Sequence, residues 1–196
     1  MITGEPVQER SQAKKKRILE EAVKVFSKRG YAGTTIKDIA EEAQVSVGII
    51  YRYYEDKHSL LIGMMEDHVQ SFIEDLKERS IKANILQTYL KKYIDEDDKV
   101  KEFSPSFQAE LRMMSIKDKE LKSLFLKRER ALRESFARSV GELVIMSSNL
   151  EYKIPIALAM IKDFNERHQG AKDQYKDYDY EKKLLVDGMV FMLNHD

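Results

Sequence analysis

The chain has 196 residues, with 34 basic and 34 acidic side chains in balance, and this length suits one or two small domains. It contains no cysteine, which excludes a disulfide framework, a thiolate metal site, an iron–sulfur cluster and a cysteine nucleophile. Only 8 glycines and 3 prolines are present, and so few helix breakers favour long helices over a turn-rich β fold. The longest apolar runs, 154–161 and 188–193, are shorter than the roughly 20 residues of a spanning helix, and nothing resembles a signal peptide. We therefore expect an all-α protein of the cytoplasm that has no contact with a membrane.

The first predicted helix has an apolar stripe that follows a basic cluster. Residues 1–9 are polar, and we expect them to be disordered. Residues 1–37 carry 9 basic and 4 acidic side chains, a net charge of +5, which suits a solvated helix face as well as a nucleic-acid partner. Three apolar residues recur at every fourth position: Ile18, Ala22 and Phe26. Gly30 stands where the left-handed cap belongs, so we expect the helix to end there.

Two short helices are predicted next, and a three-residue connection joins them. Thr35 and Asp38 have the spacing of a capping box, which places the start of one helix at Thr35. This helix ends near Ala43. The connection, 44–46, closes with a serine, which is a good N-cap for a further helix over about 47–54.

Apolar residues at helical spacing continue along the chain, so we expect the remainder to be helical as well. The expected helices are one that Asp56 caps and that includes 60–76, then 85–94, one from Pro105, 119–146, one from Pro155 to His168, and about 180–194, with a loop over 171–180. The last helix is apolar on almost every face. Burial on every face at the end of a chain calls for a partner, which predicts a homodimer.

The two short helices carry the most specific motif of the chain. Small residues, Ala40 and Ala43, stand where the helices cross, as is typical of a helix-turn-helix. The wider pattern is gapless and reads GY at 30–31, GTTIKDIAEEA at 33–43, VSVGIIYRYY at 45–54 and DKHSLL at 56–61. Over about residues 12–62 the chain closely resembles the tetracycline-repressor (TetR) family of bacterial and archaeal transcriptional regulators. The resemblance implies a DNA-binding head at 10–57 and a larger helical domain at 58–196 that dimerises and binds a small molecule.

The resemblance also implies which residues contact double-stranded DNA. Residue chemistry supports it, because the basic cluster at 14–17 can neutralise phosphates and Arg52 can read a guanine with two hydrogen bonds. Helix N-termini and tyrosine hydroxyls can bind phosphate oxygens. Tyr54 is in phase with Ile50, so we expect it in the core rather than on DNA. The candidate DNA-binding residues are Lys14, Thr35, Lys37, Ser46, Val47, Gly48, Ile49, Tyr51, Arg52, Tyr53 and Lys57.

Three positions depart from the family pattern. Gln44 replaces a common glycine, and a positive φ at this position would cost on the order of 1 kcal/mol. Val47 and Ile49 replace frequent polar residues, so the tip of the recognition helix is apolar. Such a tip suits contact with thymine methyl groups, and it can also discriminate weakly between DNA sequences.

Methionine and aromatic side chains gather on the predicted inner faces of the larger domain, with Met113 and Met160 among them. They form either a core or the wall of a cavity for an apolar or flat aromatic ligand. The candidate pocket residues are His68, Phe72, Tyr89, Phe107, Glu110, Met114, Phe125, Arg128 and Phe164. The polar members among them can equally face solvent or an ion pair.

No catalytic or metal-binding pattern accompanies this wall. The four histidines are scattered, and no phosphate-binding glycine motif or nucleophile elbow is present, so we expect neither an enzyme nor a cofactor. The leading hypothesis is a homodimeric repressor that a small-molecule effector releases from an inverted-repeat operator. The alternatives are an effector-independent or architectural DNA-binding protein with broad site preference, and an enzyme or carrier on a helical fold.

Overall fold

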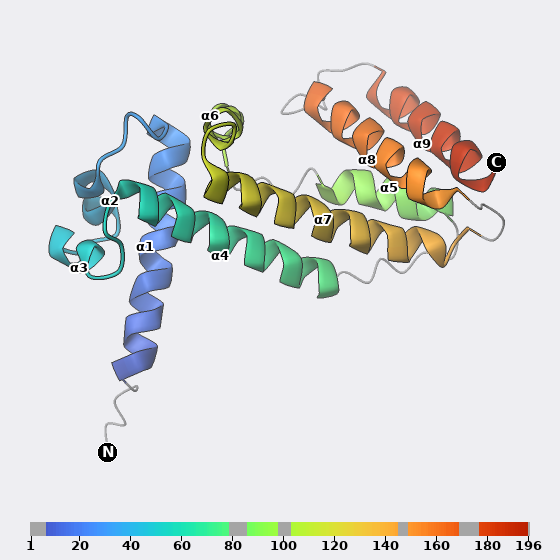
Figure 1. Ribbon diagram of the computed structural model, residues 1–196. Coiled ribbons are helices and arrows are strands. Elements are labelled where there is room, and N and C mark those ends of the chain that lie inside the picture. The colour runs from blue at the N-terminus through green and yellow to red at the C-terminus, as the bar shows by residue number, and fades with distance from the viewer. Residues whose placement is uncertain (1–6, 79–85, 98–102, 145–148, 169–176, 196) are drawn as a thin grey trace. The chain divides into compact units, whose positions relative to one another are not determined.

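The computed structural model describes residues 7–78, 86–97, 103–144, 149–168 and 177–195, and all regular secondary structure in these ranges is helical, as predicted (Figure 1). The helices are α1 (Val7–Arg29), α2 (Ile36–Glu42), α3 (Val47–Tyr51), α4 (Lys57–Glu78), α5 (Leu86–Asp97), α6 (Pro105–Ser115), α7 (Lys119–Gly141), α8 (Leu150–Arg167) and α9 (Tyr178–Asn194). None of the helices described in these ranges combines the length and the apolar character that a membrane crossing needs.

The chain divides into two compact units. Unit 1 consists of residues 1–72 and 102–128, and unit 2 consists of residues 73–101 and 129–196. Both α4 and α7 contribute to each unit, because the divisions fall within these helices. The predicted domains, 10–57 and 58–196, divide the chain by function rather than by packing, and they stay a prediction.

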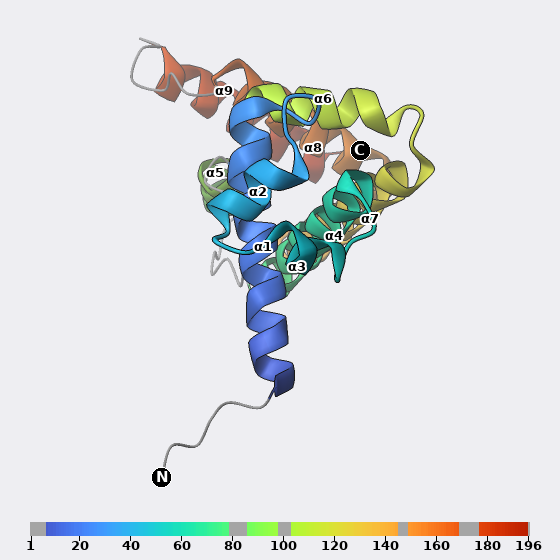
Figure 2. The ribbon, with the colours of Figure 1, turned by 90° about the vertical axis from the view of Figure 1, so that its left-hand side faces the viewer.

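Unit 1 is built around α1, which packs against α2 and α6. The predicted apolar stripe of α1 is fully buried, and Gly30 ends the helix with a φ of 72°, as predicted. In Figures 1 and 2, α6 lies at the C-terminal end of α1. The prediction of disorder over 1–9 was wrong for residues 7–9, which are helical. A hydrogen bond of 2.9 Å between the hydroxyl groups of Ser11 and Tyr53 joins this part of α1 to the segment that follows α3. Residues 1–6 lie outside the described residues.

The helix-turn-helix forms as predicted, but its second helix is shorter. Figure 2 shows α2 in front of α1 and α3 below it. Where 47–54 was expected, α3 ends at Tyr51, and the amides of Tyr53 and Tyr54 both donate to the carbonyl of Ile50. The two tyrosine side chains explain the early end, because one is bonded to α1 and the other is buried against Gly63 of α4. Ser46 takes the N-cap position without a side-chain bond.

The start of α4 is capped as predicted. Asp56 accepts the amide of Ser59 at 2.7 Å, and the hydroxyl of Ser59 accepts the amide of Asp56 at 3.0 Å. The hydrogen bonds from Ser59 hold the pKa of the Asp56 carboxyl below its usual value. Pro105 stands in the first turn of α6, again as predicted, and Ser104 caps the helix through the amide of Phe107.

Unit 2 has a core formed by α5, α8 and α9 together with the C-terminal part of α7. Several predicted boundaries in it were wrong, among them the end of the helix expected over 85–94, which continues to Asp97. The helix expected from Pro155 begins at Leu150, because Ile154 continues the buried stripe of Ala157 and Ile161 by one turn and leaves the proline inside α8. The helix expected over 119–146 ends at Gly141, and residues 145–148 lie outside the described residues. The same holds for 171–176 of the predicted loop, whereas its residues 178–180 already belong to α9.

The apolar faces of α6, α8 and α9 are only partly buried. In α9, Val186, Met189 and Leu193 are buried, whereas Leu184 and Phe191 are exposed, so the helix has an inner and an outer apolar face. Met113 of α6 and Met160 of α8 were expected on inner faces and are instead exposed. The reason is helical phase, since the buried residues on α6 are Phe107 and Leu111, and Met113 stands about 200° around the axis from Leu111.

Candidate DNA-binding surface

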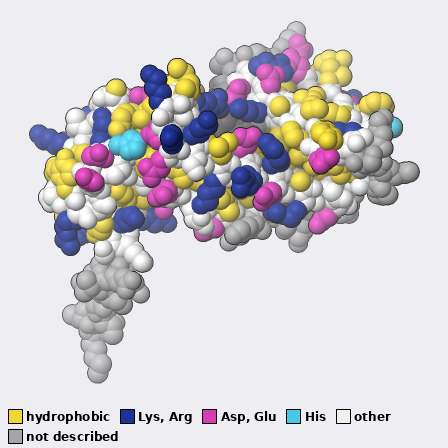
Figure 3. Space-filling view, viewed as in Figure 1, with side chains coloured by type: hydrophobic (Ala, Val, Ile, Leu, Met, Phe, Trp, Pro, Cys, Tyr) yellow, Lys and Arg dark blue, Asp and Glu magenta, His cyan; other side chains and the backbone are white. Residues whose placement is uncertain are grey.

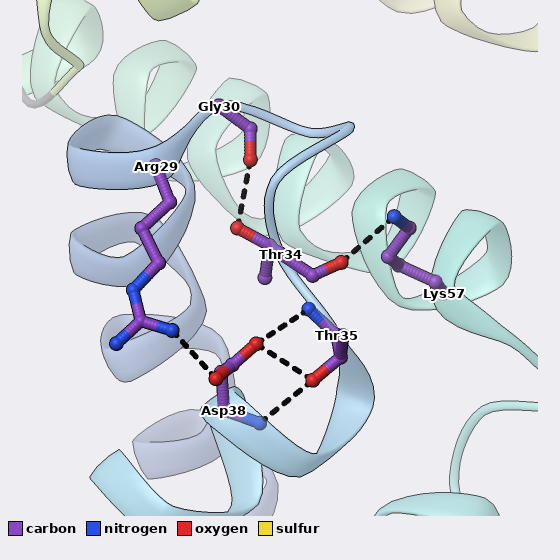
Figure 4. A network of polar contacts seen from close by, with 6 residues as sticks. All are labelled: Arg29, Gly30, Thr34, Thr35, Asp38 and Lys57. Carbon is purple, nitrogen blue, oxygen red and sulfur yellow. Dashed lines mark hydrogen bonds and ion pairs between the residues drawn. The ribbon is translucent and has the colours of Figure 1, made fainter.

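The start of α2 is fixed by a network of charged hydrogen bonds (Figure 4). Asp38 accepts the amide of Thr35 at 2.8 Å and its hydroxyl at 2.6 Å, and the Thr35 hydroxyl accepts the amide of Asp38 at 3.2 Å. Arg29 of α1 donates to the same carboxylate at 2.5 Å. The hydrogen bonds from Thr35, and then Arg29, hold the pKa of Asp38 below its usual value. The predicted capping box is confirmed, and the contact of Asp38 with Arg29 joins the start of α2 to the end of α1.

Lys57 holds the loop that leads into α2. Its ammonium group donates to the carbonyl oxygens of Tyr31 and Thr34, both at 2.8 Å, and lies 4.3 Å from the centre of the Tyr31 ring. An ammonium group has three N–H donors, so two of them are committed inside the head. A contact between Lys57 and a DNA phosphate stays a prediction. Only the third N–H of the ammonium group is available to make it.

The recognition helix α3 presents a mixed surface. Its inner side is Ile50, which is fully buried, while Tyr51 is 54% exposed and Arg52 is exposed just beyond the helix. Val47 and Ile49 are half-buried, and Gly48 is exposed, with the Ser46 hydroxyl oxygen 4.0 Å from where a Cβ would lie. The tip is therefore apolar and closely approachable, with the polar groups of Tyr51 and Arg52 beside it.

The other two tyrosines of this segment have partners within the protein. Tyr53 is half-buried and shares its hydroxyl with Ser11. Tyr54 is 6% exposed, which confirms its predicted place in the core, and burial raises the pKa of its hydroxyl. Of the three tyrosines, Tyr51 has the side chain most available to DNA.

The basic half of α1 borders the helix-turn-helix. Arg17 donates to the side chain of Gln44 at 3.0 Å, and the ammonium group of Lys15 lies 5.7 Å from the centre of the Tyr54 ring. The side chains of Lys14, Lys16 and Lys37 are exposed. In Figure 3, basic side chains gather along the lower edge of the region that holds α1, α2 and α3. Gln44 itself has a φ of 52°, the left-handed conformation considered for this position.

The candidate pocket residues fall into two groups. Tyr89 and Phe164 lie in the core of unit 2, and the other seven belong to unit 1. Within unit 1, Phe107 stacks on Phe26 with ring centres 5.5 Å apart, and Arg128 lies 4.3 Å from the centre of the Phe72 ring. Two more candidates, Met114 and Phe125, are half-buried, and the ring of His68 lies 4.5 Å from that of Phe103.

Glu110 has a role that the sequence did not reveal. Its carboxylate accepts the backbone amides of Tyr31 at 2.8 Å and Ala32 at 3.3 Å. No periodicity or motif links this residue to a loop 79 positions earlier in the chain.

Among the described residues there is no cluster of three or more side chains that could hold a metal ion.

A short exposed helix that follows a capped helix across a tight turn, beside a basic helix, is the arrangement of a helix-turn-helix motif. Residues 18–64 match the sequence model of "Bacterial regulatory proteins, tetR family". The HTH-type transcriptional regulator HbdR of Aromatoleum sp. is 39% identical over 59 residues, which are 30% of this chain and 26% of that protein. Residues 18–64 are therefore similar to the DNA-binding region of TetR-family transcriptional regulators.

Solved structures share the whole fold. A TetR-family transcriptional regulator from Mesorhizobium loti has a TM-score of 0.75 at 17% identity, with 94% of this chain and 96% of that chain covered. FadR of Bacillus subtilis, solved in complex with stearoyl-CoA, has a TM-score of 0.61 at 17% identity, with 91% and 96% covered. These likenesses show that the chain shares its fold with these two regulators beyond the matched head as well.

Proposed function

We propose that the chain is a homodimeric repressor that binds an inverted-repeat operator and is released from it by a small, largely apolar or aromatic ligand. The observation that carries the proposal is the exposed tip of α3, with Tyr51 and Arg52 beside it and the basic half of α1 next to it. The curated relative HbdR is covered over about a quarter of its length, so activity, ligand and partners are our inference.

The DNA contacts divide by chemistry. Exposed Lys14 and Lys37 supply phosphate neutralisation, and Arg52 supplies a bidentate hydrogen bond to guanine. Val47 and Ile49 flank Gly48 and supply contact with thymine methyl groups. Thr35, Ser46 and the other candidate residues contact DNA as part of the same proposal.

A second copy of the chain covers the outer face of α8 and α9. On α8, three exposed apolar residues follow one another at every fourth position: Tyr152, Ile156 and Met160. On α9, which packs against α8, the exposed apolar residues are Tyr180, Leu184 and Phe191. An apolar face of this kind marks a site of association. A two-fold pair of heads then matches half-sites about 34 Å apart along the DNA.

The ligand is the least defined part of the proposal. The half-buried and buried aromatic residues of unit 1 suit an apolar body, and the guanidinium of Arg128 lies among them over Phe72. FadR of Bacillus subtilis was solved with stearoyl-CoA, which makes an acyl thioester a reasonable first compound to test. A ligand acts by binding one conformation more tightly than the other, typically with a coupling of 1–3 kcal/mol.

The test begins with DNA. Purified protein is mixed with fragmented source-genome DNA at physiological salt, and the retained fragments are sequenced. We expect a few inverted repeats to be enriched, and Arg52→Ala to weaken binding to them about tenfold or more. Arg130→Ala, an exposed arginine on α7, is the matched control and should bind as the wild type does. Broad retention without preferred sites supports the architectural alternative, which a specific-to-non-specific affinity ratio above about 10³ excludes.

A further inference from the structure

The carboxylate of Glu110, on α6, accepts hydrogen bonds from the loop that precedes the helix-turn-helix in the chain. The two oxygens of Glu110 accept the successive backbone amides of Tyr31 and Ala32. The fit at the preceding residue is close, because a Cβ added to Gly30 would lie 2.8 Å from a carboxylate oxygen of Glu110. Hydrogen bonds from amides to an ionised carboxylate are stronger than those between neutral groups.

The opposite side of the same loop is held by a positive charge. Lys57 donates to the carbonyls of Tyr31 and Thr34, so Tyr31 gives its N–H to an anion and its carbonyl to a cation. Thr34 also donates its hydroxyl to the carbonyl of Gly30, and its side chain is buried (Figure 4). The next residue is Thr35, the N-cap of α2. The position of the loop therefore sets where α2 begins.

The beginning of α6 is attached to the last turns of α1. The hydroxyl of Ser104 donates to the carbonyl of Ser27 at 2.7 Å, and the ring of Phe107 stacks on Phe26. These contacts, together with those of Glu110, join α6 to the end of α1 and to the loop that follows it, and none of them involves α3. A shift of α6 would consequently act on the start of α2 without touching DNA.

We propose that Glu110 is a positioning residue through which α6 sets the placement of the helix-turn-helix for operator recognition. The inference rests on the proposed DNA-binding function. A conformational change that moves α6 away from the loop breaks two charge-assisted hydrogen bonds and lets α2 and α3 leave the arrangement that fits specific DNA. Glu110 then acts on DNA through the loop, and its place among the pocket candidates is given up.

The sign of the effect separates positioning from electrostatics. Removal of an acidic side chain from a DNA-binding protein should raise its affinity for any DNA slightly, because phosphates repel carboxylates. Loss of a positioning contact should instead lower the affinity for the operator and leave binding to random DNA unchanged. Specific and non-specific affinities measured side by side therefore distinguish the two roles.

The experiment compares Glu110→Gln and Glu110→Asp with the wild type. Glutamine removes the charge, and aspartate keeps the charge on a shorter stem. Glu120→Gln, at an exposed acidic residue of α7, is the control for charge. The probes are an inverted-repeat fragment retained by the wild type and a random fragment of equal length. We expect both Glu110 variants to bind the operator about tenfold more weakly, with non-specific affinity within about twofold of the wild type.

Hydrogen exchange gives an independent readout at the contact itself. In both Glu110 variants the amides of Tyr31 and Ala32 should exchange about tenfold faster or more, while the buried segment around Phe26 keeps its protection. Loss of protection throughout unit 1 in one variant would mean misfolding, and the other variant then carries the test. If the folded Glu110 variants bind the operator as tightly as Glu120→Gln does, the inference about Glu110 is overturned and the proposed function is not. Failure of the wild type to select any site overturns the proposed function, and the inference falls with it.

Discussion

Replacement of Gln44 by glycine should stabilise the protein, because this residue holds a left-handed backbone in the turn between α2 and α3. Its φ of 52° is the only positive value at a non-glycine residue in the described ranges. The side chain is exposed and accepts a hydrogen bond from the guanidinium of Arg17, 3.0 Å away. Glycine would relieve the backbone strain and lose that hydrogen bond.

The size of the effect follows from three small terms. A left-handed backbone costs a non-glycine residue about 1–2 kcal/mol. Glycine has greater freedom in the unfolded chain, which offsets about 0.5–1 kcal/mol of the stability gained by relieving this strain. The exposed charged hydrogen bond is worth about 0.5 kcal/mol or less. Gln44→Ala loses the hydrogen bond and keeps the strain, so Gln44→Gly should exceed Gln44→Ala by about 0.5–1 kcal/mol in free energy of unfolding.

Urea unfolding followed by circular dichroism measures this difference. With a slope of about 2–3 kcal/mol per molar urea, the midpoint of Gln44→Gly should lie about 0.3 M above that of Gln44→Ala. The wild type should fall between the two variants or equal the alanine variant. An alanine variant as stable as the glycine variant would refute the assignment of strain to this turn.

Three further outcomes are expected. Asp118 accepts a hydrogen bond from His58 at 2.5 Å. This hydrogen bond is the largest of several contacts that lower the pKa of the Asp118 carboxyl. A lowered carboxyl pKa stabilises the fold above the ordinary value near 4, so Asp118→Asn should be less stable than the wild type at pH 6, and the difference in urea midpoint should shrink as the pH falls towards 2. Phe191→Glu, at a 66% exposed residue of α9, should yield monomers in light scattering, whereas Met113→Glu, at a 68% exposed residue of α6, should stay dimeric; a dimeric Phe191→Glu would contradict the proposed interface. If each head neutralises about four phosphates, a plot of the logarithm of the dimer's operator affinity against the logarithm of salt concentration should have a slope near −7. Fluorescence anisotropy measures this affinity, and a slope near zero would exclude the assigned surface.

The features that were predictable from the sequence depend on residues close together in the chain. The apolar stripe of α1, the capping box of Thr35 with Asp38 and the glycine cap at Gly30 each involve spacings of four residues or fewer. Local geometry alone decides whether such a pattern can form a helix or end one. Tyr54 belongs to the same group, because its phase relative to Ile50 placed it in the core.

The features that were not predictable depend on tertiary contacts. The early end of α3 follows from the burial of Tyr54 and from the bond of Tyr53 to Ser11, 42 residues earlier. The inclusion of Pro155 inside α8 follows from the burial of Ile154, which extends the helix towards its N-terminus despite the lost amide. In each case a distant partner outweighed a local preference that was correctly recognised.

Lys57 and Glu110 show why the same limit applies to function. Residue type marked both as charged groups of interest, but type alone could not distinguish a contact with DNA or a ligand from a contact with the backbone of a loop. The structure places them on opposite sides of Tyr31, which is 26 residues from one and 79 from the other. The family match ends at residue 64, so Glu110 lies outside the segment that makes the head recognisable. If Glu110 positions the loop as we propose, chains with equivalent heads can still differ in how operator binding responds to the rest of the molecule, because that response depends on a residue that the head does not contain.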